Sequence, residues 1–402
     1  MINKNYSLYG LPEEVKFCKK CTITNQRPSS TVEFKSKDNL KSGIDFDKDG
    51  VCDACNYNEI KNNIDWDERE KLLIKLCDKF RKKKGYDCIV PGSGGKDSAY
   101  AAHLLKYKYG MNPLTVTWAP HLYTDIGWKN FTNWCHVGGF DNILFTPNGK
   151  LHRTLTKLAF INLLHPFQPF IIGQKIIGPL MALKFNVPLI FYGENQAEYG
   201  NKINDNKKSE MDKKFFSISD INQINLGGLP INEIIKRYKF NINDFEPYIP
   251  LNQNDINKAG IEQQFLGYYI KWDQQEAYYY ATQNTGFKAN DERTEGTYSK
   301  YSSIDDKIDR FHFYTYFIKF GIGQATFDSA QEIRTNKITR EEGVTLVKKF
   351  DSEFPNKYFN EFLDYIDIDE KKFWEVVDSF RSPHLWGKKN NNWELKKQIN
   401  LE

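Results

Sequence analysis

The architecture of this chain follows from residues 88–98, which read Cys88-Ile89-Val90-Pro91-Gly92-Ser93-Gly94-Gly95-Lys96-Asp97-Ser98. A short apolar run ends in a glycine-rich turn, and a helical pattern with alanine and leucine on one side continues to Tyr109. Glycines let backbone N–H groups turn inward without Cβ clashes, and the positive end of the following helix attracts an anion. The segment therefore predicts a strand, a phosphate-binding turn and a helix in succession.

The turn carries side chains suited to phosphate chemistry. Ser93 and Ser98 can donate hydroxyl hydrogen bonds, and Lys96 can neutralise phosphate charge. Asp97 can hold Mg²⁺ or orient an attacking group. The spacing matches neither G-x-x-x-x-G-K-[ST] nor G-x-G-x-x-G. The alternative interpretation is a plain glycine turn between a strand and a helix.

Further strands are expected after the turn. Short runs rich in β-branched and aromatic residues predict strands at 114–118, 142–145 and 187–192, with helical patterns between them at 150–164 and 168–185. Strands that alternate with helices pair in parallel through right-handed crossovers. We therefore expect an α/β fold with a doubly wound, Rossmann-like parallel sheet. The phosphate turn would lie at its carboxyl edge, where such sheets bind ligands.

Composition divides the chain into three expected domains. Residues 1–62 would form a polar, cysteine-containing module, and residues 63–225 the α/β domain. Residues 226–402 would form a mostly helical region that contacts a substrate or partner. Within it, Thr339 and Glu342 predict a capping box, and residues 388–402 are expected to be a solvated tail or a weak helix.

The cysteines of the first 55 residues form two C-x-x-C pairs, Cys18 with Cys21 and Cys52 with Cys55. Such pairs are typical of a tetrahedral Zn²⁺ site with four thiolates, which would stabilise a segment too short and polar for its own core. A four-cysteine Fe–S cluster and four unligated thiols are the alternatives. The remaining cysteines are isolated and are expected to pack in the core; they are Cys77, Cys88 and Cys135.

A polar string, Gly193-Glu194-Asn195-Gln196-Ala197-Glu198-Tyr199-Gly200, follows the last predicted strand. Carboxylates and an amide at the carboxyl end of a strand suit a polar ligand. The candidate substrate contacts are Glu194, Asn195, Glu198 and Tyr199. A capped loop without a ligand is the alternative.

A second polar string runs from Tyr298 to Lys307 and contains adjacent carboxylates. Such a pair can bind magnesium pyrophosphate or sugar hydroxyls, which makes Asp305, Asp306 and Lys307 candidate substrate contacts. The alternative is a helix N-terminus, with Ser302 or Ser303 as the cap and the two carboxylates complementing the helix dipole.

Several basic residues are candidates for contacts with phosphate or carboxylate groups. Lys175 lies among apolar residues, where an unpaired lysine is costly, so it can either reach the phosphates or snorkel to the surface. Lys319, Arg334 and Arg340 are further candidates, with solvated positions as the alternative.

The string from Ser93 to Ser98 resembles the signature of the PP-loop ATP pyrophosphatases, the family of GMP synthetase, argininosuccinate synthetase, asparagine synthetase and the tRNA thiolases. The resemblance implies that a substrate oxygen attacks the α-phosphorus of ATP, that pyrophosphate leaves, and that a nitrogen or sulfur nucleophile then displaces AMP. The implied catalytic residues are Lys96, Asp97 and Lys175. The implied ATP contacts are Ser93, Gly94, Gly95, Lys96, Asp97, Ser98 and Gly193, with adenine near Thr117 and Trp118.

Over nearly the whole chain, the order of motifs is similar to that of the N-acetyl sugar amidotransferases of bacterial surface-polysaccharide and flagellin-glycan pathways. The motifs are Phe17-Cys-Lys-Lys-Cys21, Phe46-Asp-Lys-Asp-Gly-Val-Cys-Asp-Ala-Cys55, Pro91 to Ser98, Gly193 to Gly200, Ser303 to Lys307 and Ile338-Thr-Arg-Glu-Glu342. The resemblance implies an N-acetylated sugar as substrate, either nucleotide-linked or a nonulosonic acid. Its acetamido oxygen would be adenylated, and ammonia would convert the group to an acetamidino group. We find no glutaminase signature, so the ammonia would come from a separate glutaminase and synthase-like pair.

Two other functions stay open. A tRNA thiolase also combines four N-terminal cysteines with this loop, although thiolases usually need further cysteines nearby, and here only Cys88 and Cys135 are available. A nucleotide-binding subunit of a glycan-synthesis complex would bind ATP without turnover. The net charge of +4, from 56 basic and 52 acidic residues, does not indicate nucleic-acid binding. Without an apolar run of about 18 residues, we expect a cytoplasmic protein that does not enter a membrane.

Overall fold

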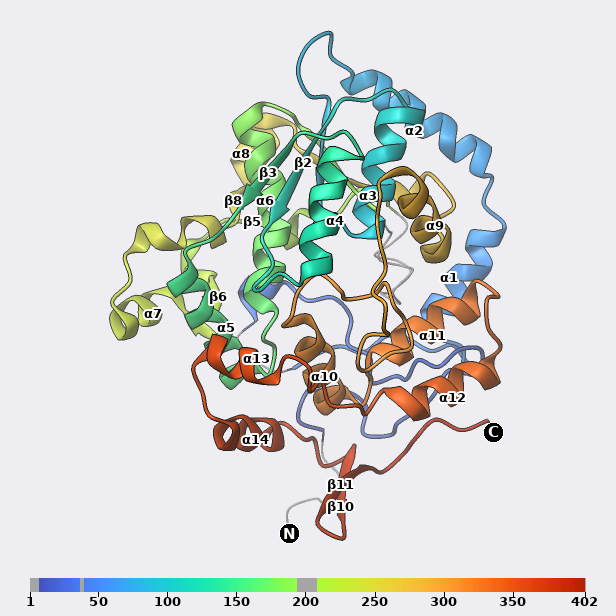
Figure 1. Ribbon diagram of the computed structural model, residues 1–402, viewed down its shortest axis with the longest axis vertical. Helices are drawn as coiled ribbons and strands as arrows, with labels where there is room; N and C mark the ends of the chain where they lie inside the picture. The colour runs from blue at the N-terminus through green and yellow to red at the C-terminus, as the bar shows by residue number, and fades with distance from the viewer. Residues whose placement is uncertain (1–6, 37–39, 194–207, 402) are drawn as a thin grey trace.

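The computed structural model describes residues 7–36, 40–193 and 208–401 (Figure 1). Its central sheet has five strands in the order β3-β2-β1-β4-β9, and every neighbouring pair is parallel. The strands are β1 (Cys88–Pro91), β2 (Pro113–Trp118), β3 (Asn142–Phe145), β4 (Leu189–Tyr192) and β9 (Glu262–Phe265). The predicted α/β fold with a parallel sheet is confirmed, and the strand order reverses direction between β1 and β4.

Helices cover both faces of the sheet because buried side chains alternate along the strands. Ile89 and Ile190 belong to the larger core, whereas Val90 and Leu189 belong to a second core on the opposite face. The larger core is closed by α5 (Gly149–Leu163) and α6 (Gln168–Phe185). The second is closed by α2 (Trp66–Phe80), α3 (Lys96–His103), α4 (Asp125–His136) and α9 (Gln274–Asn284), with one π-helical segment (Leu104–Lys108) continuing α3.

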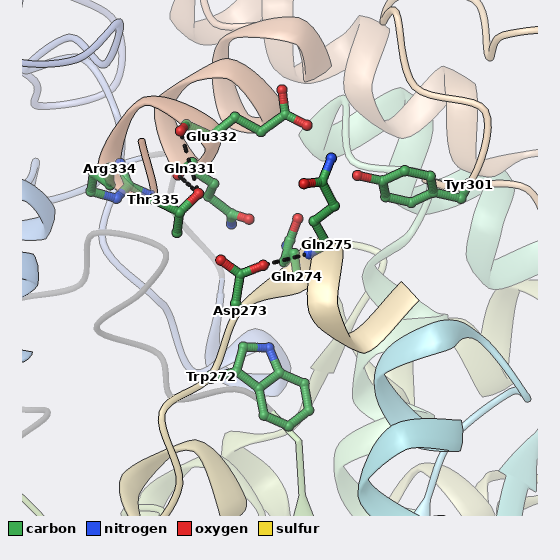
Figure 2. A pocket seen from close by; sticks show the side chains of 9 residues that line it. All are labelled: Trp272, Asp273, Gln274, Gln275, Tyr301, Gln331, Glu332, Arg334 and Thr335. Atoms are coloured by element: carbon green, nitrogen blue, oxygen red, sulfur yellow. Dashed lines mark hydrogen bonds between the residues drawn. The ribbon is translucent and has the colours of Figure 1, made fainter. Parts of the chain in front are cut away.

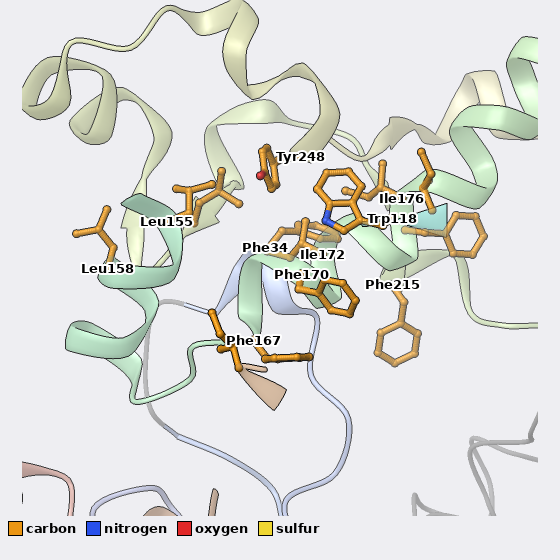
Figure 3. Packing of buried hydrophobic residues seen from close by; sticks show 14 of the residues in the cluster. Phe34, Trp118, Leu155, Leu158, Phe167, Phe170, Ile172, Ile176, Phe215 and Tyr248 are labelled. Carbon is orange, nitrogen blue, oxygen red and sulfur yellow. The ribbon is translucent and has the colours of Figure 1, made fainter. Parts of the chain in front are cut away.

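The larger core brings α6 directly against β2 (Figure 3). Ile172 and Ile176 of α6 are buried beside Trp118, whose ring lies edge-on to Tyr248 at a centroid distance of 5.3 Å. A Cβ atom on Gly173 would lie 2.2 Å from the Trp118 ring. Only glycine at residue 173 therefore allows this approach between helix and strand.

The sheet extends beyond the predicted boundary at residue 225, because β9 pairs with β4 along its whole length. Between them lie α7 (Ile231–Tyr238), α8 (Gln253–Ala259) and short paired strands. The short pairs are β5 (Ser217–Ile218) with β8 (Leu251–Asn252), and β6 (Asn225–Leu226) with β7 (Leu229–Pro230). Residues up to 265 therefore belong structurally with the α/β part of the chain.

The last hundred residues are mostly helical and pack against α5. Their helices are α10 (Asp309–Phe320), α11 (Gln324–Arg334), α12 (Arg340–Phe350), α13 (Phe359–Ile366) and α14 (Glu370–Ser379), and α1 (Asp53–Asn62) lies near α11 in Figure 1. Phe160 of α5 contacts Phe362 of α13 and Phe373 of α14, with ring centroids 5.6 and 5.2 Å apart. The predicted capping box of Thr339 and Glu342 is present at the start of α12.

The expectation of a tail or weak helix at residues 388–402 is wrong. The chain forms a hairpin of β10 (Trp386–Lys389) and β11 (Asn392–Leu395). Asn390 and Asn391 between them both have positive φ, at 49° and 64°. Asparagine tolerates this conformation, and two such residues in succession form the turn that joins twisted antiparallel strands. Among the helices of the described residues, none combines the length and apolar character that a bilayer crossing needs.

Candidate active site

The phosphate loop lies between the end of β1 at Pro91 and the start of α3 at Lys96. This is where the strand order reverses, the position at which open α/β sheets bind ligands. Gly94 has a φ of +81°, and a Cβ atom there would lie 2.8 Å from the Phe131 Cα atom of α4. Both the backbone conformation and the contact with α4 therefore require glycine, and the loop stays open to a ligand on its other side.

Lys96 and Asp97 form an ion pair at the start of α3. The Lys96 ammonium lies 2.5 Å from Asp97 Oδ2, although the Lys96 residue is only 7% exposed. Asp97 Oδ1 is buried and has no hydrogen-bond partner among the described residues. An unpartnered carboxylate oxygen beside a phosphate-binding turn is a suitable ligand for Mg²⁺.

Two cavities meet at this loop, and both are lined by Ser93, Gly95 and Asp97. The first, which we call the strand-side cavity, has a volume of about 380 Å³ and extends along β2, β4 and α6. The second, the helix-side cavity, has a volume of about 520 Å³ and extends toward α10 and α11. A ligand in each cavity could therefore reach the same loop.

The strand-side cavity is lined by the predicted ATP contacts Trp118 and Gly193, and by the predicted catalytic residue Lys175. Burial lowers the pKa of Lys175, and the charge of Glu33 opposes this effect. The Lys175 ammonium lies 4.7 Å from the ring centroid of Phe215. Thr117 lines neither cavity; its side chain is fully buried and its hydroxyl accepts a hydrogen bond from Asn142.

Besides Asp97, three carboxyl groups line the helix-side cavity. Burial raises the pKa of Asp305, and the nearby Ser93 hydroxyl of the phosphate loop opposes this effect. Burial also raises the pKa of Asp309 to about 8 and that of Asp328 to about 7, helped by neighbouring carboxylates and opposed by the hydroxyls of Ser303 and Thr297 respectively. Asp309 and Asp328 can therefore carry or accept a proton near neutral pH.

The adjacent predicted substrate contacts Asp305, Asp306 and Lys307 separate in space. Asp306 is buried and accepts hydrogen bonds from the backbone of His121, Leu122 and Ile308, and from the His121 ring. The Lys307 ammonium lies 3.8 Å from Glu361 and lines neither cavity. Only Asp305 of the three lies at the site.

The alternative in which Ser302 or Ser303 caps a helix is also wrong. Helix α10 begins at Asp309, and Ile308 occupies its N-cap position. Ser303 has a φ of 54° and its hydroxyl accepts a hydrogen bond from the Gln324 amide. The segment instead forms an irregular wall of the helix-side cavity.

Sequence reasoning did not identify three residues of the helix-side cavity, namely Asp309, Gln324 and Asp328. Gln324 is 2% exposed, and its Oε1 atom has no hydrogen-bond partner among the described residues. A signal was present for one of them, because Asp305 and Asp309 lie four residues apart at the start of a helical pattern. The others belong to α11, which no catalytic motif marks. The predicted contacts Glu194, Asn195, Glu198 and Tyr199 lie outside the described residues.

The four N-terminal cysteines form one buried cluster. Their sulfur atoms all lie within 4.8 Å of one another, with Cys18 and Cys55 at 3.9 Å and Cys21 and Cys52 at 3.7 Å. Zn–S bonds of about 2.3 Å in a tetrahedron place sulfur atoms about 3.8 Å apart. The backbone N–H groups of Lys20 and Cys52 donate to the Cys18 sulfur. The cluster therefore fits a single metal ion of zinc size better than a multi-iron cluster, whose cysteines bind separate irons.

The cysteine cluster also supports α11. Its core contains Ala330 and contacts Phe327 and Ile333 of that helix. The solvated alternative for Arg334 is wrong, because its guanidinium is buried and lies 4.0 Å from the Cys21 sulfur. The cysteine module thus holds the helix that supplies Gln324 and Asp328 to the helix-side cavity.

A narrow cleft lies between α9 and α11 (Figure 2). Asp273, Gln274 and Gln275 face Gln331 and Glu332 across it. Its volume is about 30 Å³, against about 520 Å³ for the helix-side cavity. It shares lining residues with the helix-side cavity but is too small to hold a substrate.

Comparisons with known proteins concern parts of the chain. Residues 295–400 match the family described as LPS biosynthesis protein WbpG-like, C-terminal domain. An uncharacterized protein of Methanocaldococcus jannaschii is 34% identical over 77 residues, which are 19% of this chain and 27% of that protein. The structure of NMN synthetase from Francisella tularensis aligns over 74% of this chain and 96% of its own, with 9% identity and a TM-score of 0.32. The C-terminal quarter of the chain is thus similar to LPS biosynthesis proteins.

Proposed function

We propose that this protein is an ATP-dependent amidotransferase of the PP-loop class that acts on an N-acetylated sugar of a bacterial surface polysaccharide. It converts an acetamido group to an acetamidino group and releases AMP and pyrophosphate. The observation that carries this proposal is the meeting of two cavities on Ser93, Gly95 and Asp97. A reaction that joins a nucleotide to a second substrate needs both at one phosphate-binding loop.

The strand-side cavity is the proposed nucleotide site. Trp118 offers an aromatic surface, and Lys175 offers a positive charge in a poorly solvated place. Asp97 lines both cavities, and Lys96, which is paired with it, lines the helix-side cavity, so they would act on the α-phosphate and its Mg²⁺.

The helix-side cavity is the proposed sugar site. Residues 301–331, which supply most of its helical wall, lie inside the segment similar to LPS biosynthesis proteins. Carboxyl and amide groups bind sugar hydroxyls by hydrogen bonds, and Asp305, Asp309 and Gln324 provide them. The amidino product is cationic, so carboxylates at this position would also stabilise it.

The proposed reaction proceeds in two steps. The acetamido oxygen attacks the α-phosphorus, the bond from that phosphorus to the pyrophosphate oxygen breaks, and pyrophosphate leaves. Ammonia then adds to the activated carbon, gives up a proton, and the carbon–oxygen bond breaks with release of AMP. Asp305 lies against the phosphate loop and is the proposed acceptor of that proton.

The other assignments complete the proposal. Zn²⁺ in the four-cysteine cluster would stabilise the N-terminal module, and Mg²⁺ would bind at Asp97. Ammonia would come from a separate glutaminase and synthase-like pair, and the protein would act in the cytoplasm, where ATP is available.

Sulfur transfer to tRNA is less well supported. Cys88 begins β1, so it lies at the opposite end of that strand from the phosphate loop, and burial raises its pKa. Burial also raises the pKa of Cys135. A sulfur carrier needs an accessible thiolate, and these thiols are held in the protonated form.

An isotope experiment tests the proposed function. Candidate N-acetylated sugars labelled with ¹⁸O in the acetamido oxygen would be incubated with ATP, Mg²⁺ and an ammonium salt. We expect the label in AMP, detected by mass spectrometry, together with pyrophosphate. Asp97→Asn is the inactive control, and Asp125→Asn, an exposed residue of α4, is the matched active control. Formation of ADP and phosphate instead would contradict the proposal.

A further inference from the structure

A third cavity continues from the helix-side cavity on the side away from the phosphate loop. This cavity, which we call the basic chamber, has a volume of about 190 Å³ and lies between residues 27–33 and α10. It shares Arg27, Ser30, His312 and Tyr316 with the helix-side cavity. A ligand in the helix-side cavity could therefore extend into the basic chamber.

The described lining of the basic chamber carries more positive than negative charge. Arg27, Lys41 and Lys319 face a single carboxylate, that of Glu33. Burial alone would raise the pKa of Glu33, but the positive charges around it hold that pKa well below its usual range. Glu33 is also close to another partner, because its Oε2 atom lies 3.4 Å from His165 Nε2. The single carboxylate of Glu33 therefore compensates the charge of several cationic groups only in part.

Lys319 is the most deeply buried of these three cations, and its ammonium lies 5.3, 5.1 and 6.0 Å from the ring centroids of Tyr9, Phe320 and Phe380. The residue is 5% exposed, and its ammonium donates a 2.7 Å hydrogen bond to the carbonyl of Leu163. Within the described ranges it takes part in no ion pair. Burial lowers its pKa to about 7, with Lys41 adding to this effect and Glu33 opposing it. A buried ammonium is costly unless an anion compensates it, so its position on a cavity wall points to a ligand.

We propose that the basic chamber binds an anionic group, a carboxylate or a phosphate, on the ligand that occupies the helix-side cavity. The identification of this ligand as the acceptor sugar rests on the proposed function. The anionic group receives hydrogen bonds and charge from Lys319 and Arg27, and this fixes the orientation of the sugar relative to the phosphate loop. An acidic sugar would supply a carboxylate, and a nucleotide-linked sugar would supply its diphosphate.

Calorimetric titration with three probes tests this inference and separates the two sources. The probes are N-acetylneuraminic acid with a carboxylate, UDP-N-acetylglucosamine with a diphosphate, and neutral N-acetylglucosamine. α,β-Methylene ATP is present throughout to fill the strand-side cavity. We expect one of the two anionic probes to bind at least tenfold more tightly than the neutral probe, and which one binds identifies the anionic group. Equal affinity for all three probes would overturn the inference.

The variants separate a ligand contact from a structural lysine. Lys319→Met is expected to weaken binding of the anionic probe at least tenfold and to leave binding of the neutral probe unchanged. The control Lys348→Met, at an exposed position of α12, should change the affinity for neither probe. Lys41→Met, at a half-buried position, provides a second variant should Lys319→Met fold poorly. Unchanged binding of the anionic probe to both chamber variants would overturn the inference.

The pH dependence gives an independent readout. An anion favours protonated Lys319, whose pKa is about 7 without a ligand, so affinity for the anionic probe should fall from pH 6 to pH 9. Glu33, Lys41, His165, Arg27 and His312 also face the chamber. Lys319→Arg, which stays charged, should therefore remove most of the pH dependence. An identical pH dependence in the two proteins would contradict a role for Lys319.

Activity distinguishes failure of the inference from failure of the proposed function. If no acceptor sugar yields AMP but binding of the anionic probe still depends on Lys319, the inference about the basic chamber is supported and the amidotransferase proposal is contradicted. If a sugar yields AMP with the same KM in wild type and Lys319→Met, the proposed function is supported and anion binding in the basic chamber is contradicted.

Discussion

The strand-side and helix-side cavities share a loop, but the chain builds them in different ways. The shared wall is one continuous stretch of six residues, 93–98, which runs from the glycine turn after β1 into the first turn of α3. The helix-side cavity is assembled from residues as far apart in sequence as Arg27 and Gln331. Local backbone geometry thus builds the proposed phosphate site, whereas tertiary packing of the N-terminal and C-terminal parts builds the cavity proposed for the sugar.

The largest effect is expected at the cysteine cluster. The cluster supports α11, and therefore the helix-side cavity but not the strand-side cavity. Cys52→Ala should release the proposed Zn²⁺, and because metal binding counts toward folding, the free energy of unfolding should fall by several kcal/mol. At temperatures where the variant is folded, loosening of α11 should weaken sugar binding more than ATP binding. Metal analysis, thermal unfolding and the two titrations measure these changes.

Cys135→Ala, at a half-buried isolated cysteine, is the matched control and should keep its metal. If Cys52→Ala weakened ATP binding and sugar binding equally, the two cavities would behave as one cooperative unit. This would contradict the separate construction of the two cavities.

Substitution of one lysine in each cavity tests whether the two cavities have different roles. Lys96 lines the helix-side cavity and Lys175 the strand-side cavity. Lys96→Met should lower kcat by about 10²-fold or more, because its charge acts where the substrates meet. Lys175→Met should raise the KM for ATP about tenfold, the loss expected of one charged contact, and should change kcat less. Steady-state kinetics with AMP release as the signal checks both; the reverse pattern would exchange the roles of the cavities.

The elements that sequence analysis predicted best are those with local causes. All four strands predicted around residues 88–192 exist, because each is a short apolar run bounded by turn residues. The capping box at Thr339 and the cysteine cluster follow in the same way from fixed spacings. The fifth strand, β9, was missed because Glu262-Gln263-Gln264-Phe265 is polar and is buried only by its place in the fold.

The same distinction between local and distant causes applies to the candidate site. The strand, glycine turn and helix of residues 88–98 were predicted from their sequence, and they are present. Asp305 and Asp306 were treated alike, since sequence adjacency does not reveal which side chain turns inward to His121. Lys319 was assigned a solvated alternative, although the helix that carries it is buried on most sides. Orientation within an irregular segment depends on contacts with distant residues, and a single sequence does not contain them.

The adjacent aspartates provide the third test. Asp305→Asn should raise the KM for the sugar about tenfold, a loss of about 1.4 kcal/mol, with little change in thermal stability, because its carboxyl faces a cavity. Asp306→Asn should instead lower the free energy of unfolding by about 1–3 kcal/mol, since an amide cannot accept all the hydrogen bonds that its carboxylate accepts from the backbone. Matching effects of the two substitutions would contradict their different placement.

The smallest expected effect is a pH dependence of stability that belongs to the helix-side cavity. Burial raises the pKa of Asp309 to about 8, above the value of about 3.9 in an unfolded chain. Between these values the folded protein binds more protons, so the contribution of Asp309 makes the protein less stable as the pH rises from about 4 to 8. Water reaches this half-buried group and screens part of the effect. Thermal unfolding from pH 5 to 8 should therefore show Asp309→Asn gaining about 1 kcal/mol relative to wild type, while the exposed Asp125→Asn gains nothing. A constant difference between wild type and Asp309→Asn across this range would mean that the carboxyl is ionised throughout, and the cavity would then lack the proton-holding group that distinguishes it from the strand side.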